Sequence, residues 1–335
     1  MVALPSGFRS FVTNVGIKDN TDDFTVVAAD TVVAAAGVFT LSRFAGPSVL
    51  VSRRHVSDHR ARAVVVISKN ANVATGEQGM ANALEVVKGV GERLGCDPHD
   101  VLIASTGVIG RQYPIERVRA GLAALPTELP GSSAADADVD GDTLDAVWRR
   151  VIDRTFNCVS VDTDTSTSDT AIVLASGAAG PVDVAALETA LEDVARSLTK
   201  QVARDGEGAE TLIEVCVDGA RDAAQAKTVA KAIVNSPLVK TAVHGADPNW
   251  GRVAMAVGKC SDYTDIDQEN VVIRFGDQEV YPVAVDESGL MRLSDYMRGD
   301  EVRIHVTLNI GNASSTVWGC DLTDGYVRIN ADYTT

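Results

Sequence analysis

The sequence predicts an α+β fold in which layered sheets are covered by helices. Short β-branched runs bounded by turn residues fill much of the first third, and longer amphipathic stretches interrupt them. The run from Arg303 to Ile310 alternates apolar and polar residues, as a strand with one buried face does. Strands and helices arranged in runs, without a repeat of fixed period, favour sheets packed against helices over a repeat architecture.

The first 125 residues contain four predicted strands and two predicted helices. The strands are expected at residues 24–29, 48–51, 63–68 and 101–105. The first helix should run from Gln78 to Gly95, because its apolar residues fall near one face and glycine, with Pro98 beyond it, ends the run. The second should run from Pro114 to Leu125, since proline lacks the N–H that the first turn of a helix leaves unbonded.

The segment Pro126–Gly141 separates these elements from the rest of the chain. Its sequence, PTELPGSSAADADVDG, has almost no large apolar residue and is predicted to be an exposed connector. Beyond it we predict helices at 143–156, 182–204 and 220–234, and strands at 211–217, 271–275, 279–283 and 303–310. The apolar face of the helix at 182–204 is expected to contain Leu187, Ala190, Leu191, Val194 and Leu198.

Charge and cysteine content exclude several classes of partner. The 335-residue chain has a net charge of −16, so nucleic acid and anionic membranes would be repelled. We expect no signal peptide in the start MVALPSGFRSFV, and the longest apolar stretches are too short to span a bilayer. The five cysteines are widely spaced and lack a C-x-x-C pair, which is typical of reduced, mostly buried thiols in a cytoplasmic protein.

Three short segments could bind a ligand, although each alone is also compatible with an ordinary turn. KNANVATGEQG (69–79) could point backbone N–H groups toward an anion at a helix N-terminus. In STGVIGRQYP (105–114), a Thr-Gly pair after a buried strand could present a hydroxyl and an N–H to one oxyanion. In the third, Glu207 lies between glycines just before a predicted strand, where its carboxylate could bind an amine.

No metal site or cofactor is predicted. DTDTSTSDT (162–170) alternates acids, but the glycine and glutamate required by a calcium loop are replaced by Thr167 and Val173. His244 and Asp247 could be metal ligands, but no second histidine lies near them in the sequence. Phosphate-loop, serine-elbow and zinc-protease motifs are also absent from the sequence.

Taken together, the motifs resemble those of the ornithine acetyltransferase family. The matching segments, in the family's order, are KNANVATGEQG, ASTGVIGR, FNCVSVDTDTSTSDT, DGEGA, VNSPLVKTAVHGADPNWGR and YVRINADY. They cover nearly the whole chain, and the variants TGVIGRQYP, VDTDTSTSDT and GKCSDYTDIDQE are most similar to family members from clavulanic acid gene clusters.

The resemblance implies a fold, a reaction and a set of site residues. Family members resemble N-terminal-nucleophile hydrolases, cut themselves before an internal threonine, and use that threonine to carry acetyl from N-acetylornithine to glutamate. It places the oxyanion hole at Thr106 and Gly107, and substrate contacts at Glu207, Asn330 and Thr335. It further implies small-molecule substrates, no cofactor and a homo-oligomer, with residues 1–142 and 143–335 corresponding to the family's α and β chains.

The chain departs from the family pattern in the connector. Family members carry there several dozen further residues, including the nucleophile in an M-A-T-L-L type stretch, whereas this chain joins its ends near Ser133–Asp136. Thr127 aligns before the gap in a hydrophilic, turn-rich setting and is not expected to act as nucleophile. Two hypotheses therefore remain: an ornithine acetyltransferase, or a catalytically inactive homologue that binds only substrate or a partner.

Overall fold

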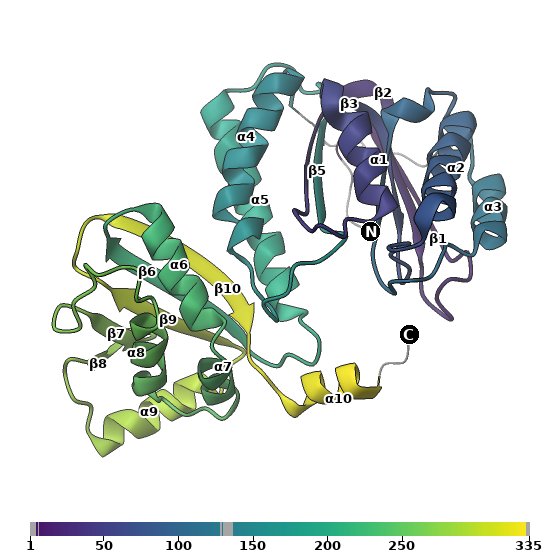
Figure 1. The fold of residues 1–335 in the computed structure, drawn as a ribbon. Coiled ribbons are helices and arrows are strands. Elements are labelled where there is room, and N and C mark those ends of the chain that lie inside the picture. The colour runs from purple at the N-terminus through teal and green to yellow at the C-terminus, as the bar shows by residue number, and fades with distance from the viewer. Residues whose placement is uncertain (1–4, 6, 128, 130–136, 333–335) are drawn as a thin grey trace. The chain divides into compact units, whose positions relative to one another are not determined.

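The computed structural model describes residues 5, 7–127, 129 and 137–332, which form two compact units. The first unit extends to Arg150 and includes Thr165–Leu191; the second consists of Val151–Asp164 and Glu192–Thr334. Figure 1 shows a mixed sheet with helices in each unit. The fold class is therefore α+β, as predicted.

The first unit is built on a five-stranded sheet in which β2 has three partners. Its strands are β1 (Phe8–Thr13), β2 (Phe24–Phe39), β3 (Arg60–Ile67), β4 (Val101–Ser105) and β5 (Thr170–Ala175). The order is β1-β2-β3-β4, and β5 pairs with the second half of β2. Only β3 and β4 run parallel. Strand β2 is longer than predicted: its register against β3 shifts between Ala28 and Val33, it pairs with β3 as far as Ala34, and from Ala34 to Phe39 it pairs with β5.

Three helices belong to this sheet: α1 (Pro47–His55), α2 (Gly76–Leu94) and α3 (Ile115–Ala124). Val65 and Ile67 of β3 pack with Val86 and Val90 of α2 in one buried cluster, to which Val118 of α3 also belongs. The helices predicted at 78–95 and 114–125 are therefore confirmed within two residues. Single 3-10 turns lie at η1 (Val56–Asp58) and η2 (Pro98–Asp100).

The strand predicted at residues 48–51 is wrong, because these residues lie within α1. Pro47 occupies the first turn, and the β-branched run that suggested a strand buries Val49 and Val51. The helix covers the free edge of β4: the Ser52 hydroxyl donates to Ile103 O and accepts from Ile103 N, both at 2.6 Å. His55 Nδ1 lies 2.8 Å from Val101 O. Side chains thus replace the neighbouring strand that this edge lacks.

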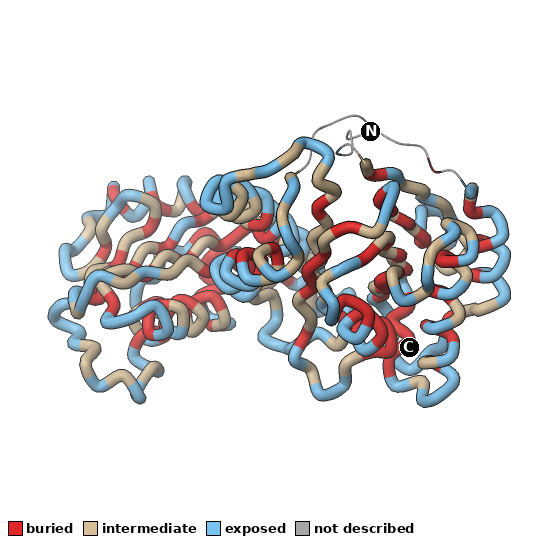
Figure 2. Tube along the Cα trace, turned by 90° about the horizontal axis from the view of Figure 1, so that it is seen from above, coloured by how far each residue is buried: buried red, intermediate tan, exposed pale blue. Residues whose placement is uncertain are grey.

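The second unit has its own five-stranded sheet, in the order β10-β6-β9-β7-β8. The strands are β6 (Leu212–Ala220), β7 (Val272–Phe275), β8 (Gln278–Tyr281), β9 (Glu301–Thr307) and β10 (Ala313–Cys320). The helices are α6 (Ala223–Val234), α7 (Pro237–His244), α8 (Trp250–Gly258), α9 (Glu287–Met297) and α10 (Asp324–Asp332), with η3 at Phe156–Cys158. A large buried cluster joins this sheet to α6, α7, α8 and α9. Figure 2 shows buried and exposed positions alternating along many strands.

Helices α4 (Gly141–Arg154) and α5 (Val184–Arg204) each contain a point where the chain passes between the units, and a further passage lies between Asp164 and Thr165. Both were predicted within two residues. The predicted apolar face of α5 is wrong, however: Val194 and Leu198 are 59% and 44% exposed, while Ala195 and Thr199 are buried. The prediction rested only on the spacing of apolar residues along the helix, which does not show which side of α5 other elements cover.

The connector is described only in part. Leu129 is buried and joins the core of the first unit, so this part of the connector is not exposed as predicted. The predicted junction at 133–136 lies outside the described residues. The correspondence of residues 1–142 and 143–335 to the α and β chains of the family stays a prediction. Across the described residues, no helix is both long and apolar enough to cross a membrane.

Candidate functional site

The Thr106–Gly107 pair forms a tight turn at the end of β4. Thr106 N donates to Ile67 O at 3.2 Å, and Val108 N donates to Lys69 O at 3.1 Å, so the turn lies against the chain leaving β3. Gly107 has φ +129°, and a Cβ there would lie 2.2 Å from the carbonyl carbon of Lys69. Only glycine permits this approach.

Thr106 and Gly107 are both exposed. Within the described part of the chain, neither the Thr106 hydroxyl nor the Gly107 N–H has a hydrogen-bond partner. A hydroxyl and an N–H that are adjacent, exposed and uncommitted can both donate to one oxyanion. The turn therefore has the chemical groups that the Thr-Gly pattern predicted.

A buried hydrogen-bond network supports this turn from below. The Tyr113 hydroxyl donates to Ser105 Oγ at 2.7 Å. The single proton of the Ser105 hydroxyl has two acceptors within reach, Ser48 Oγ at 3.0 Å and Ala71 O at 3.2 Å. Burial raises the pKa of Tyr113 to about 12, so this phenol remains a donor at neutral pH. Since Ser105 immediately precedes Thr106, the network fixes the end of β4 from which the turn begins.

The segment 69–79 bonds mainly to itself and to the turn. Asn72 Nδ2 donates to Gly79 O at 2.8 Å, and the Thr75 hydroxyl donates to Asn72 O at the same distance. Ala71 N donates to Val108 O. These contacts favour the structural interpretation of KNANVATGEQG: it is a scaffold for the Thr106–Gly107 turn.

In the second unit, two of the predicted substrate residues are in contact. Glu207 lies on the loop between α5 and β6, Asn330 lies on α10, and Asn330 Nδ2 donates to Glu207 Oε2 at 2.9 Å. Both residues are exposed, so the pair is accessible to a ligand. Thr335, the third predicted contact, lies outside the described residues.

Glycines let the Glu207 loop pass close to the start of α10. Gly208 has φ +67°, and a Cβ there would lie 2.4 Å from Tyr326 N. A Cβ on Gly206 would lie 2.7 Å from Cys320 Sγ. Thr323 adds a hydrogen bond from its hydroxyl to Gly208 O at 2.6 Å. The glycines on either side of Glu207 are therefore required by packing, and the loop is more than a solvated turn.

One cluster of the described residues could offer ligand atoms to a metal. Those of Glu210, His244 and Asp321 lie within 4.8 Å of one another. One Asp321 oxygen, however, already accepts N–H groups from Glu210 and Thr211, at 2.9 and 3.0 Å. The sequence had paired His244 with Asp247 and missed Asp321. The only feature of the sequence that could have indicated Asp321 is its position directly after a strand.

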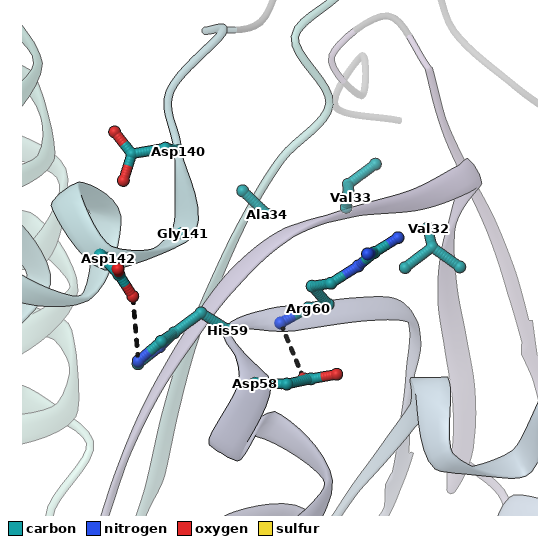
Figure 3. A pocket seen from close by; sticks show the side chains of 9 residues that line it. All are labelled: Val32, Val33, Ala34, Asp58, His59, Arg60, Asp140, Gly141 and Asp142. Carbon is teal, nitrogen blue, oxygen red and sulfur yellow. Dashed lines mark hydrogen bonds and ion pairs between the residues drawn. The ribbon is translucent and has the colours of Figure 1, made fainter.

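A shallow pocket of about 380 Å³ lies at the start of α4, but no predicted site residue lines it. Figure 3 shows His59 pointing toward Asp142, with their ionisable groups 3.7 Å apart, and Arg60 above Asp58. Asp140 accepts the Thr143 N–H at 2.9 Å, which lowers the pKa of this carboxyl. Asp140 thus binds the first turn of α4, Asp58 accepts the Arg60 N–H and Asp142 faces His59, and we do not assign chemistry to the pocket.

The predicted site residues fall in both units. Thr106 and Gly107 belong to the first, and Glu207 and Asn330 belong to the second. Each pair is well defined within its own unit. That all four face one cavity stays a prediction.

The chain matches the model of the ArgJ family over residues 9–135 and 127–335. It is 47% identical over 379 residues to the arginine biosynthesis bifunctional protein ArgJ 2 of a Nostoc species, covering 99% of this chain and 98% of that protein. It is 49% identical over 385 residues to the glutamate N-acetyltransferase Oat2 of Streptomyces clavuligerus, with the same coverage. A crystal structure of ArgJ from Bacillus halodurans is 42% identical, with a TM-score of 0.55, and covers 59% of this chain and 96% of that one.

These alignments also identify a break. They run over 379 and 385 residues, whereas this chain has 335, so the relatives contain internal residues that have no counterpart here. The two matches to the family model overlap at residues 127–135, within the connector where the sequence predicted a gap. On either side of this break the match continues through both halves, and the chain belongs to the ArgJ family.

Proposed function

We propose that this chain carries the acyl-transfer site of a glutamate N-acetyltransferase that uses N-acetylornithine. Thr106 and Gly107 would stabilise the oxyanion, while Glu207, Asn330 and Thr335 would contact substrate. The observation that supports this best is the exposed, uncommitted pair of donors at Thr106 and Gly107 in a member of the ArgJ family. The relatives are named for arginine biosynthesis and for glutamate N-acetyltransferase activity.

The chemistry of each group fits this role. Attack on an acetyl carbonyl places negative charge on its oxygen, and two fixed donors stabilise that charge more in the transition state than in the substrate. The Glu207 carboxylate can accept hydrogen bonds from a substrate ammonium, and the Asn330 amide can orient the carboxylate as well as bind polar atoms. Acyl transfer of this kind requires no cofactor.

A second candidate function is substrate binding without transfer, and the break in the connector favours it. In the family the nucleophile is a threonine of the segment that this chain lacks. Thr127, the described connector threonine, is exposed. Without an attacking group no acyl-enzyme forms, and the oxyanion donors have no intermediate to stabilise.

Two measurements on purified protein separate the candidates. Release of ornithine from N-acetylornithine, dependent on glutamate and lost in Thr106→Ala, would support transfer. Saturable ornithine binding by calorimetry, without release, would support binding alone. A folded protein that shows neither would contradict both proposals. We further propose a cytoplasmic homo-oligomer in arginine or clavulanate-type metabolism; a monomer in light scattering would contradict the assembly.

A further inference from the structure

Asp321 joins the Glu207 loop to the end of β10. Its side chain is fully buried. One carboxylate oxygen accepts the N–H groups of Glu210 and Thr211 at 2.9 and 3.0 Å, and the Asp321 N–H donates to Thr211 O at 3.0 Å. Three hydrogen bonds therefore hold the part of the loop that lies three and four residues after Glu207.

A second attachment holds the loop directly beside Glu207. The Thr323 hydroxyl, two residues after Asp321, donates to Gly208 O at 2.6 Å and accepts the Tyr326 N–H at 3.2 Å. Tyr326 lies in the first turn of α10, the helix that carries Asn330. The segment 321–323 thus contacts the loop of Glu207 and the helix of Asn330 at the same time.

Helix α7 supplies basic groups to the buried carboxylate. His244 Nδ1 lies 3.2 Å from the second oxygen of Asp321, and 3.6 Å from a Glu210 carboxylate oxygen. Lys240, one turn earlier on α7, is buried and donates to Val161 O at 2.9 Å and to the carbonyl of Cys320. One Asp321 oxygen thus accepts two backbone N–H groups and the other faces the His244 ring, so both oxygens of this buried carboxylate have polar partners.

We propose that Asp321 is a positioning residue that holds the Glu207 loop so that the Glu207 carboxylate faces Asn330 and can receive a substrate amine. This inference rests on the function proposed above for Glu207 and Asn330. It assigns the Glu210–His244–Asp321 cluster to loop anchoring, because one Asp321 oxygen accepts two N–H groups of the loop and the other lies 3.2 Å from His244 Nδ1. Asp321 is not expected to touch the substrate.

The test measures ornithine binding to the full chain by calorimetry. Asp321→Asn keeps the size of the side chain but removes its charge, so we expect the Kd for ornithine to rise about tenfold. Asp295→Asn is the matched control, since Asp295 lies on α9, is exposed and forms its described ion pair with Arg298, away from the Glu207 loop. An unchanged Kd in Asp321→Asn would overturn the proposal.

A double-mutant cycle distinguishes positioning from general destabilisation. If Asp321 acts through Glu207, Asp321→Asn should weaken ornithine binding little further once Glu207→Gln is present. Equal, additive losses in both backgrounds would contradict positioning. If the wild-type chain does not bind ornithine, the proposed function fails. Amide exchange then decides the inference: Asp321→Asn must accelerate exchange at residues 206–211, and unchanged exchange there overturns it.

Zinc alone provides the final arm of the test. We expect Zn²⁺, titrated into the wild-type chain, to give no binding that depends on His244. Tight binding that His244→Ala abolishes would identify the cluster as a metal site and overturn its assignment as an anchor.

Discussion

Strands β5 and β6 have similar apolar content but very different surroundings. In β5, TAIVLA, every residue except Ala175 is only partly buried. In β6, LIEVCVDGA, Ile213, Val215 and Val217 have no exposed surface. Strand β6 lies between β10 and β9, whereas β5 pairs only with β2. An apolar sequence therefore does not bury a strand unless neighbouring strands and a covering layer are present.

The first unit is also where the chain is shorter than its relatives. The overlap of the family matches, at residues 127–135, precedes α4 and lies within the range of this unit. We infer that the partly exposed faces of β5 would be covered by residues that the relatives contain. The family match continues through the second unit, and a large cluster of buried residues forms its core.

The largest expected effect concerns catalysis. We expect the chain as it stands to run as one band of 35.2 kDa on a denaturing gel and to show no acetyl transfer above background. Inserting the segment of Streptomyces clavuligerus Oat2 that aligns with the gap should restore self-cleavage and transfer. Loss of an activated nucleophile costs about 10⁶-fold in rate, so the gain should be of that order.

The control for this insertion is Thr106→Ala in the same chimera. This variant should still fold and cut itself. Its rate of acetyl transfer should be lower by about 10²–10³-fold, because one oxyanion donor is lost. Two fragments from the unmodified chain, the smaller beginning with threonine, would show that it contains an unrecognised nucleophile.

Core truncation should affect the two strands unequally. Ile213→Ala in β6 should lower the free energy of unfolding by about 3–4 kcal/mol, because the side chain is fully buried and leaves a cavity. Ile172→Ala in β5 should cost only about 1–2 kcal/mol, since its side chain is partly solvated already. Urea denaturation with a separate probe in each unit measures both changes in the free energy of unfolding. Equal changes in the two variants would contradict the difference in burial between β5 and β6.

Backbone strain, by contrast, should be alike in the two units. Gly107→Ala and Gly208→Ala both place a Cβ within 2.4 Å of backbone at positive φ, so each should destabilise its unit by about 1–3 kcal/mol. Gly95→Ala is the control: φ is +66°, but no atom lies within 4 Å, so only the cost of the conformation remains. Thermal unfolding of the three variants measures these losses of stability, and Gly95→Ala should show the smallest.

The smallest effect is a pH dependence in the second unit. Burial acts to raise the pKa of Glu214, but hydrogen bonds from Lys200 and Trp318 outweigh it and the pKa is lowered. A lowered carboxyl pKa stabilises the fold above the unfolded value, 4.5, and this contribution is lost as pH falls through the folded value. Glu214→Gln should therefore flatten the fall in Tm below pH 4.5. An identical pH profile in the variant would refute this.

Local sequence signals were sufficient to predict a helix or strand where its hydrophobic pattern and the residues at its ends indicate the same element. β4 was predicted at 101–105, where it lies, and α2 was predicted because glycine and proline follow its apolar period. Conversely, β5 and β10 were not predicted, although the apolar run of β5 is similar to that of β4. The helix α1 was mistaken for a strand because a short β-branched run fits either structure.

The site shows the same limit. Composition alone marked the connector. The resemblance to the family predicted Thr106, Gly107, Glu207, Asn330 and Thr335 as site residues, and it placed the missing residues in that connector. Only the tertiary structure revealed that Asn330 contacts Glu207 across 123 positions, and that Asp321 anchors the loop between them. Periodicity and turn chemistry are properties of neighbours in sequence. The covered face of α5 and the partner of a buried carboxylate depend on which distant segments pack together, which no local pattern encodes.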